Sequence, residues 1–197
     1  RVHVIDAARL TGDQLRIVRE DVERIWSPYG VTFEWRKGPP APAADHPGVV
    51  VLALTPVRAG APGLGHPGPD EGPPPLGSVG FASPVAPINV LRVFVSPRRL
   101  IASARVARTP LSQWPRALQE RFVAQAIGRT AAHELGHYLL ATRQHTGRGL
   151  MREGFSASEL LAPGLEGFAL DAPDLALMRT RWVAVTACRV DHLAEAR

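Results

Sequence analysis

Cysteine, aromatic residues and long apolar runs are all scarce in this 197-residue chain. The single cysteine, Cys188, excludes an internal disulfide framework and a cysteine-rich zinc finger. The longest apolar run, residues 49–54, is far shorter than the roughly 20 residues of a membrane-spanning helix, so we expect no membrane span. Aromatic residues make up only 6% of the chain and do not interleave with basic residues as a base-stacking surface requires.

Lysine is almost missing too, and the net charge of +5 comes from arginine. Lys37 is the only lysine, and Arg98 and Arg99 are the only two arginines adjacent in the sequence. A nucleic-acid-binding surface concentrates basic residues in a patch or stripe. The scattered arginines are more typical of a solvated surface, and we predict no nucleic-acid partner.

Hydrophobic residues still make up 45% of the chain, which is enough for the buried core of one domain. Alternation and short apolar runs predict strands at residues 2–5, 31–35, 49–54, 77–82 and 89–95. Apolar residues three and four apart predict helices at residues 11–29, 113–140, 156–161 and 171–187. Residues 56–77 contain 13 Pro or Gly among 22 residues, which predicts a long surface loop.

The order strand, helix, strand, strand favours a right-handed crossover and a mixed or parallel sheet. We therefore expect an α/β (α+β) fold with a small twisted mixed sheet, backed by the helices at residues 11–29 and 113–140. Residues 1–145 are expected to form an N-terminal subdomain with this sheet. Residues 146–197 are expected to form a smaller, mostly helical C-terminal subdomain of the same domain.

The longest predicted helix contains the sequence His133-Glu134-Leu-Gly-His137. Histidines at positions i and i+4 emerge on the same face of a helix, one turn apart, and can bind one metal ion. Neutral imidazole suits Zn²⁺, and Glu134 is placed to take a proton from a water molecule that the metal acidifies. Two unpaired histidines in an apolar core would each cost about 1–3 kcal/mol, which argues against a purely structural role. Gly136 weakens the helix, which makes sense if another group must approach it closely.

A catalytic zinc site has three protein ligands, and His145 is the expected third. It lies eight residues after His137 and past the expected helix end, and four or five extended residues span about 13–18 Å, enough to return to the metal. A downstream carboxylate such as Glu159 is the alternative third ligand, and His192 is a weaker candidate.

These residues resemble the signature of metzincin-type zinc metallopeptidases, H-E-x-x-H-x-x-G-x-x-H followed by a methionine-bearing turn. The resemblance is closest to small bacterial proteins with a displaced third histidine and a G-[IL]-M-R turn. One departure is clear: Leu140 stands where the signature has glycine, and the third histidine arrives two residues late, so we expect the helix to run on slightly. The matching residues are His133, Glu134, Gly136, His137, Leu139, Leu140, His145, Gly149, Met151 and Arg152.

The resemblance implies roles for further residues. Met151 would lie beneath the metal as an apolar floor without ligating it. The strand at residues 77–82, with Gly80 and Phe81, would bind substrate as an added antiparallel strand. Residues 152–155 would form part of the pocket beyond the scissile bond.

The sequence thus predicts a single catalytic domain over residues 1–197, a zinc-dependent metalloendopeptidase with Glu134 as its catalytic base. The expected cofactor is Zn²⁺, the expected partner is a peptide or protein substrate, and the protein is expected to be a monomer. The alternative function is a zinc-stabilised binding or regulatory domain without turnover. The compartment stays open, although a chain that begins at Arg1 and not at Met slightly favours export.

Overall fold

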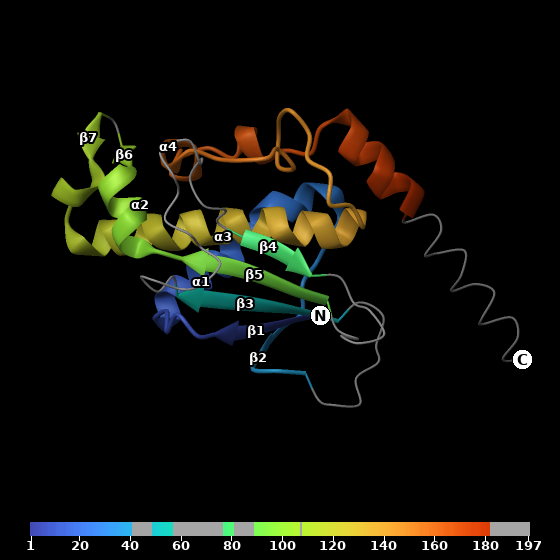
Figure 1. Ribbon diagram of the computed structural model, residues 1–197, viewed down its shortest axis with the longest axis horizontal. Coiled ribbons are helices and arrows are strands. Elements are labelled where there is room, and N and C mark those ends of the chain that lie inside the picture. Colours follow the sequence, from blue (N-terminus) through green and yellow to red (C-terminus); the bar gives the residue numbers. More distant parts are fainter. Residues whose placement is uncertain (41–48, 57–76, 81–88, 107, 182–197) are drawn as a thin grey trace, which may run out of the picture.

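The strands of the protein form one mixed sheet in the order β2-β1-β3-β5-β4 (Figure 1). The computed structural model describes residues 1–40, 49–56, 77–80, 89–106 and 108–181. The strands are β1 (Val2–Asp6), β2 (Trp35–Lys37), β3 (Val50–Pro56), β4 (Gly77–Gly80) and β5 (Asn89–Val95). Strands β2, β1, β3 and β5 are parallel, and β4 pairs antiparallel with β5 at the edge of the sheet. The predicted mixed sheet in an α/β fold is confirmed.

Two long helices, α1 (Gly12–Trp26) and α3 (Arg116–Leu140), pack together on one face of this sheet (Figure 1). Helix α1 begins with a capping box, because the Thr11 hydroxyl accepts the Gln14 amide and the Gln14 side chain accepts the Thr11 amide. Gly128 of α3 allows the close crossing, since a Cβ there would come within 3.0 Å of Val18 O of α1. The apolar face of α1 thereby joins the core beneath the sheet.

Short elements complete the fold. They include helix α2 (Pro97–Ser103), the hairpin of β6 (Arg105–Val106) and β7 (Thr109–Pro110), and a turn at Leu111–Gln113 before α3. After α3 come helix α4 (Ala157–Leu160), a turn at Glu166–Phe168 and a helix over residues 172–181. No helix within the described ranges combines the length and apolar character needed to cross a membrane.

Several predicted boundaries are wrong. The strand expected at residues 31–35 begins only at Trp35. The alternation there reflects Val31, which is buried, and Phe33, which is partly buried against the core, in chain that precedes the pairing with β1. The helix expected at residues 11–29 ends at Trp26, and Ser27–Tyr29 form a 3₁₀ turn that contains Pro28. The helix α2 and the β6–β7 hairpin were not predicted at all.

Other predictions fall only partly within the described residues. The strand at residues 77–82 is present as Gly77–Gly80, and residues 81 and 82 lie outside the described ranges. The helix at residues 171–187 is helical over residues 172–181, and its remainder also lies outside. Most of the loop at residues 56–77 is likewise not described.

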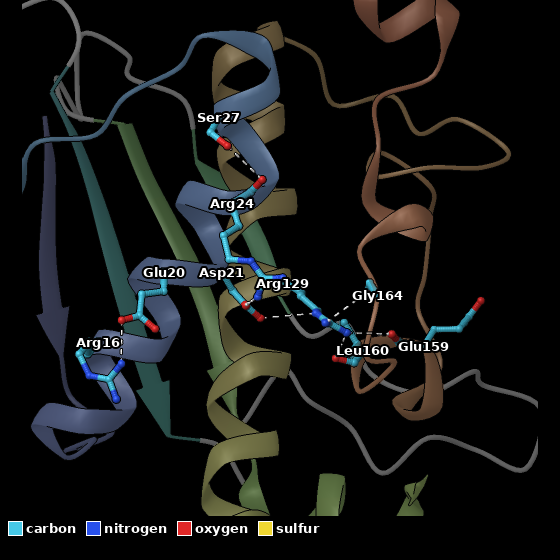
Figure 2. A network of polar contacts seen from close by, with 9 residues as sticks. All are labelled: Arg16, Glu20, Asp21, Arg24, Ser27, Arg129, Glu159, Leu160 and Gly164. Atoms are coloured by element: carbon cyan, nitrogen blue, oxygen red, sulfur yellow. Dashed lines mark hydrogen bonds and ion pairs between the residues drawn. The ribbon is translucent and has the colours of Figure 1, made fainter. Parts of the chain in front are cut away.

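A buried arginine holds the chain after α3 against the two long helices (Figure 2). Arg129 of α3 has a side chain that is 1% exposed, and its Nε lies 3.5 Å from a carboxylate oxygen of Asp21 on α1. Its guanidinium also donates to the carbonyls of Leu160 (2.8 Å), Glu159 (3.3 Å) and Gly164 (3.4 Å). Breaking a buried pair of this kind costs about 3–5 kcal/mol, so this cluster fixes the C-terminal segment over α3.

Candidate metal centre

Three histidines converge where the end of α3 meets the loop that follows it. His133 and His137 lie one turn apart on α3, and His145 comes from the loop. One ring nitrogen of each histidine lies within 4.8 Å of the others. His133 and His137 are buried while His145 is exposed, so the group is reached from the side of the loop. The three histidines predicted as ligands are therefore brought together and could hold a metal ion.

Backbone carbonyls fix the two helical histidines. His133 Nδ1 lies 2.7 Å from Leu150 O, and His137 Nδ1 lies 2.9 Å from Thr142 O. A carbonyl can only accept a hydrogen bond, so Nδ1 must carry the proton of each neutral ring. This leaves a lone pair on each Nε2, which is the arrangement that metal-binding histidines adopt.

The two Nε2 atoms lie 3.1 Å apart. Two lone pairs at this distance repel each other unless a cation lies between them. Burial lowers the pKa of His133 to about 4, so a second proton on that ring does not supply the cation at neutral pH. Zn–N bonds of about 2.05 Å at a tetrahedral angle would separate two nitrogens by about 3.3 Å, which fits the spacing found here.

The end of α3 places the third histidine. The helix runs on to Leu140, as expected, and Ala141 then takes a left-handed conformation with φ +50°. Its amide bonds back to Tyr138 O, and the Thr142 amide bonds to His137 O at 3.1 Å. The turn thus falls one residue later than the glycine of the common signature, and it delivers the Thr142 carbonyl to His137.

The methionine turn at Gly149, Leu150 and Met151 lies directly under the helix. Gly149 has φ +73°, and a Cβ there would overlap Ala169 O, so only glycine fits this turn. Met151 is fully buried, and a Cβ at Gly136 would overlap its sulfur. The predicted close approach to Gly136 is therefore made by Met151. The same turn supplies the Leu150 carbonyl that fixes His133.

Glu134 follows the first histidine and is buried, with an exposed fraction of 4%. Its Oε2 has no hydrogen-bond partner among the described residues, and burial raises the pKa of Glu134 to about 8. A buried, unpartnered carboxyl group is costly unless a cation or a substrate lies nearby. A divalent ion on the adjacent histidines would favour the charged form and lower this pKa.

Residues that follow the methionine turn lie beside His133. The Phe155 ring lies edge-on to His133 at 5.9 Å between centroids and stacks on Phe168 at 5.0 Å. The Arg152 guanidinium lies 4.2 Å from the Phe155 centroid and pairs with Glu159 at 2.9 Å. This places part of the predicted 152–155 segment beside the histidines.

The alternative third ligands fare differently. The Glu159 carboxylate accepts the Ser156 amide at 2.8 Å as the capping box of α4 and also pairs with Arg152, and it is not part of the histidine group. His192 lies outside the described residues. Gly80 ends strand β4 and pairs with Val90, whereas Phe81 lies outside the described residues.

Sequence reasoning missed the backbone partners of the ligands. The carbonyls of Thr142 and Leu150 leave no signal in residue type, because every residue has a carbonyl. It also missed Trp26, whose buried indole N–H donates to Ala132 O at 3.1 Å, next to His133. The spacing of residues within the helix gives no signal for this contact, because its partner lies 106 positions away.

A scan against models of known protein families finds no match to this chain, and no curated protein sequence is significantly similar to it. The resemblance to metzincin-type peptidases therefore depends on the motif residues alone.

Proposed function

We propose that this protein is a zinc-dependent endopeptidase of metzincin type, with His133, His137 and His145 as the metal ligands. The observation that carries the proposal is the pair of Nε2 lone pairs facing each other at 3.1 Å, with a third histidine alongside and a buried glutamate next in sequence. Three imidazole side chains and a side open to solvent suit a zinc ion with one position left for water or substrate.

The chemistry is divided between the metal and Glu134. His133, His137 and His145 would hold the zinc ion, which would lower the pKa of a bound water molecule to about 7 and polarise a carbonyl group. Glu134 accepts the proton of the attacking water and passes it to the leaving amine. Its burial in an apolar setting strengthens its interaction with any charge that develops beside it.

Strand β4 is the proposed site of substrate binding. It is the last strand in the order of the described sheet and pairs with β5 along one edge. Its other edge has no partner strand among the described residues. An extended peptide can add to such an edge through backbone hydrogen bonds, which favours a protein or peptide substrate. Phe155, packed against His133, would then contact the side chain that follows the scissile bond.

The test compares zinc-loaded wild type with Glu134→Gln on a broad peptide library. Glu134→Gln should retain stoichiometric zinc and lose at least about 100-fold in kcat, the contribution expected of a general base. The control is Glu20→Gln, which removes an exposed carboxylate of α1 that pairs with Arg16 and should cleave as wild type does. A wild type that binds zinc stoichiometrically but cleaves nothing would contradict the peptidase and favour the zinc-stabilised binding domain.

A further inference from the structure

The end of α1 and the turn that follows it contact both the helix that carries His133 and the segment that follows the methionine turn. Trp26 bonds to the backbone of α3 immediately before His133. Three residues later, the Tyr29 ring lies edge-on to Trp26 at 5.9 Å between centroids. The Tyr29 hydroxyl accepts the Leu170 amide at 2.7 Å, a contact between residues 141 positions apart.

Hydrogen bonds continue from Leu170 to the first metal ligand. The carbonyl of Ala169, the residue before Leu170, accepts the Leu150 amide at 2.9 Å. The Leu150 carbonyl in turn accepts His133 Nδ1 at 2.7 Å. We call these three contacts, Tyr29 to Leu170, Ala169 to Leu150, and Leu150 to His133, the Tyr29 relay.

We propose that Tyr29 is a positioning residue for His133 and acts through the Tyr29 relay; this inference rests on the proposed metal centre. The relay ends at the Leu150 carbonyl. Its hydrogen bond to Nδ1 determines which ring nitrogen of His133 carries the proton. Its middle part is tightly confined, because the Ala169 carbonyl lies against Gly149, where no Cβ fits. A shift of residues 169 and 170 is therefore transmitted to the methionine turn and cannot be absorbed locally.

The relay differs from ordinary core packing in what it controls. Apolar contacts of Leu150, Met151 and Leu170 keep the turn buried, but they do not set the direction of the Leu150 carbonyl. That direction is set by the hydrogen bonds on either side of the turn. Loss of the Tyr29 hydroxyl removes the partner of the Leu170 amide while leaving the aromatic ring in the core.

The experiment measures metal binding by Tyr29→Phe. Zinc affinity is determined by competition with a chelator, and the absorption spectrum of the Co²⁺-loaded protein reports the geometry around the metal. We expect about tenfold weaker zinc binding, the lower end of the loss seen when partners of metal ligands are removed, and a shifted Co²⁺ spectrum.

Two controls separate positioning from general loss of stability. Ser27→Ala removes an exposed hydroxyl of the same turn, whose one hydrogen bond to the described part of the chain is to Arg24 O at 3.4 Å. Ile25→Val removes one buried methyl group from α1 and lowers stability without touching the relay. Both should bind zinc within twofold of wild type and give its Co²⁺ spectrum.

The outcomes are distinct. Unchanged affinity and spectrum in Tyr29→Phe would refute the positioning role alone, and so would an equal loss of affinity in Ile25→Val. A wild type that binds no zinc would refute the metal centre itself, and the relay with it. If Tyr29→Phe does not fold, amide hydrogen exchange of the wild type decides. The Leu150 and Leu170 amides should gain protection together when zinc binds, and protection of only one of them would contradict the relay.

Discussion

The two halves of the candidate metal centre are built in different ways. The helical half, residues 116–140 with His133 and His137, is positioned by burial of α3 against α1 and the sheet. The loop half, residues 141–155 with His145 and the methionine turn, has one isolated β-bridge, between Thr146 and Arg152, and short turns. It is joined to the rest of the protein by single hydrogen bonds to backbone groups, such as Leu150 N to Ala169 O at 2.9 Å. Single polar contacts should therefore matter most where the loop half meets the rest of the protein.

The largest expected effect on stability follows from removal of Arg129, which holds the chain after the loop half against α3. Arg129→Met removes the buried cation beside Asp21, which then keeps only the exposed Arg24 at 3.4 Å, and it leaves the carbonyl of Leu160 without its donor. We expect a loss of about 3–5 kcal/mol in the free energy of unfolding, measured by denaturant titration. The control is Arg116→Met, which breaks an exposed pair with Glu120 on the same helix and should cost at most about 0.5 kcal/mol. Similar losses in both variants would show that Arg129 does not hold the C-terminal segment.

Gly136→Ala tests the contact between the two halves directly. The added methyl group overlaps the Met151 sulfur, so the turn or the helix must shift. We expect a loss of about 1–3 kcal/mol in stability together with weaker zinc binding. Gly12→Ala, in helix α1 where a Cβ meets nothing within 4 Å, should be neutral or stabilising. Undiminished zinc binding by Gly136→Ala would mean that the halves do not need this close approach.

The pH dependence of the metal-free protein separates Glu134 from the histidines. Burial raises the pKa of Glu134 to about 8, against 4.5 when unfolded. The stability that protonated Glu134 gives the folded state is therefore complete at low pH and is lost as the pH rises towards 8. His133, with its pKa lowered to about 4, acts in the opposite sense and only as pH falls below 6.5. Between pH 6.5 and 8, metal-free wild type should lose up to about 1.4 kcal/mol of stability per pH unit.

The variant Glu134→Gln should lack that slope, because it has no carboxyl group to titrate at this position. Urea unfolding of both proteins across the range, in the presence of a chelator, provides the comparison. Parallel stability curves for the two proteins would show that Glu134 is not buried in an apolar setting.

The smallest expected effect is at the boundary between the halves. Ala141 adopts a left-handed conformation that glycine adopts at no steric cost. Ala141→Gly should therefore raise stability by about 0.5–1 kcal/mol while leaving zinc affinity unchanged. Thermal unfolding is the measurement, and a destabilised Ala141→Gly would indicate that the alanine side chain has a packing role.

The difference between the halves also explains what could be predicted from sequence. Helix periodicity and the spacing of His133 and His137 indicated the helical half, since burial in a helix leaves a repeating signal. His145 was indicated by the reach of the chain after His137 and by a resemblance to known motifs, and Met151 by that resemblance alone. The Tyr29 hydroxyl and the carbonyls of Thr142 and Leu150 left no signal, because a partner 141 positions away cannot be read from local pattern.

Boundaries failed for a related reason. The alternation at residues 31–35 reflects the burial of Val31 and the partial burial of Phe33. Strand pairing depends instead on where the neighbouring strand lies, and β1 pairs with this segment only from Trp35 onward. Helix α2 was missed because a helix of seven residues, beginning at Pro97, has too few turns for its periodicity to be recognised.

X-ray absorption of the zinc-loaded protein tests whether both halves bind the same metal ion. We predict one zinc ion per chain with three imidazole nitrogens at about 2.0–2.1 Å, and the loss of one of these in His145→Ala. Absence of stoichiometric zinc, or an identical set of ligands in His145→Ala, would contradict a centre built from both halves.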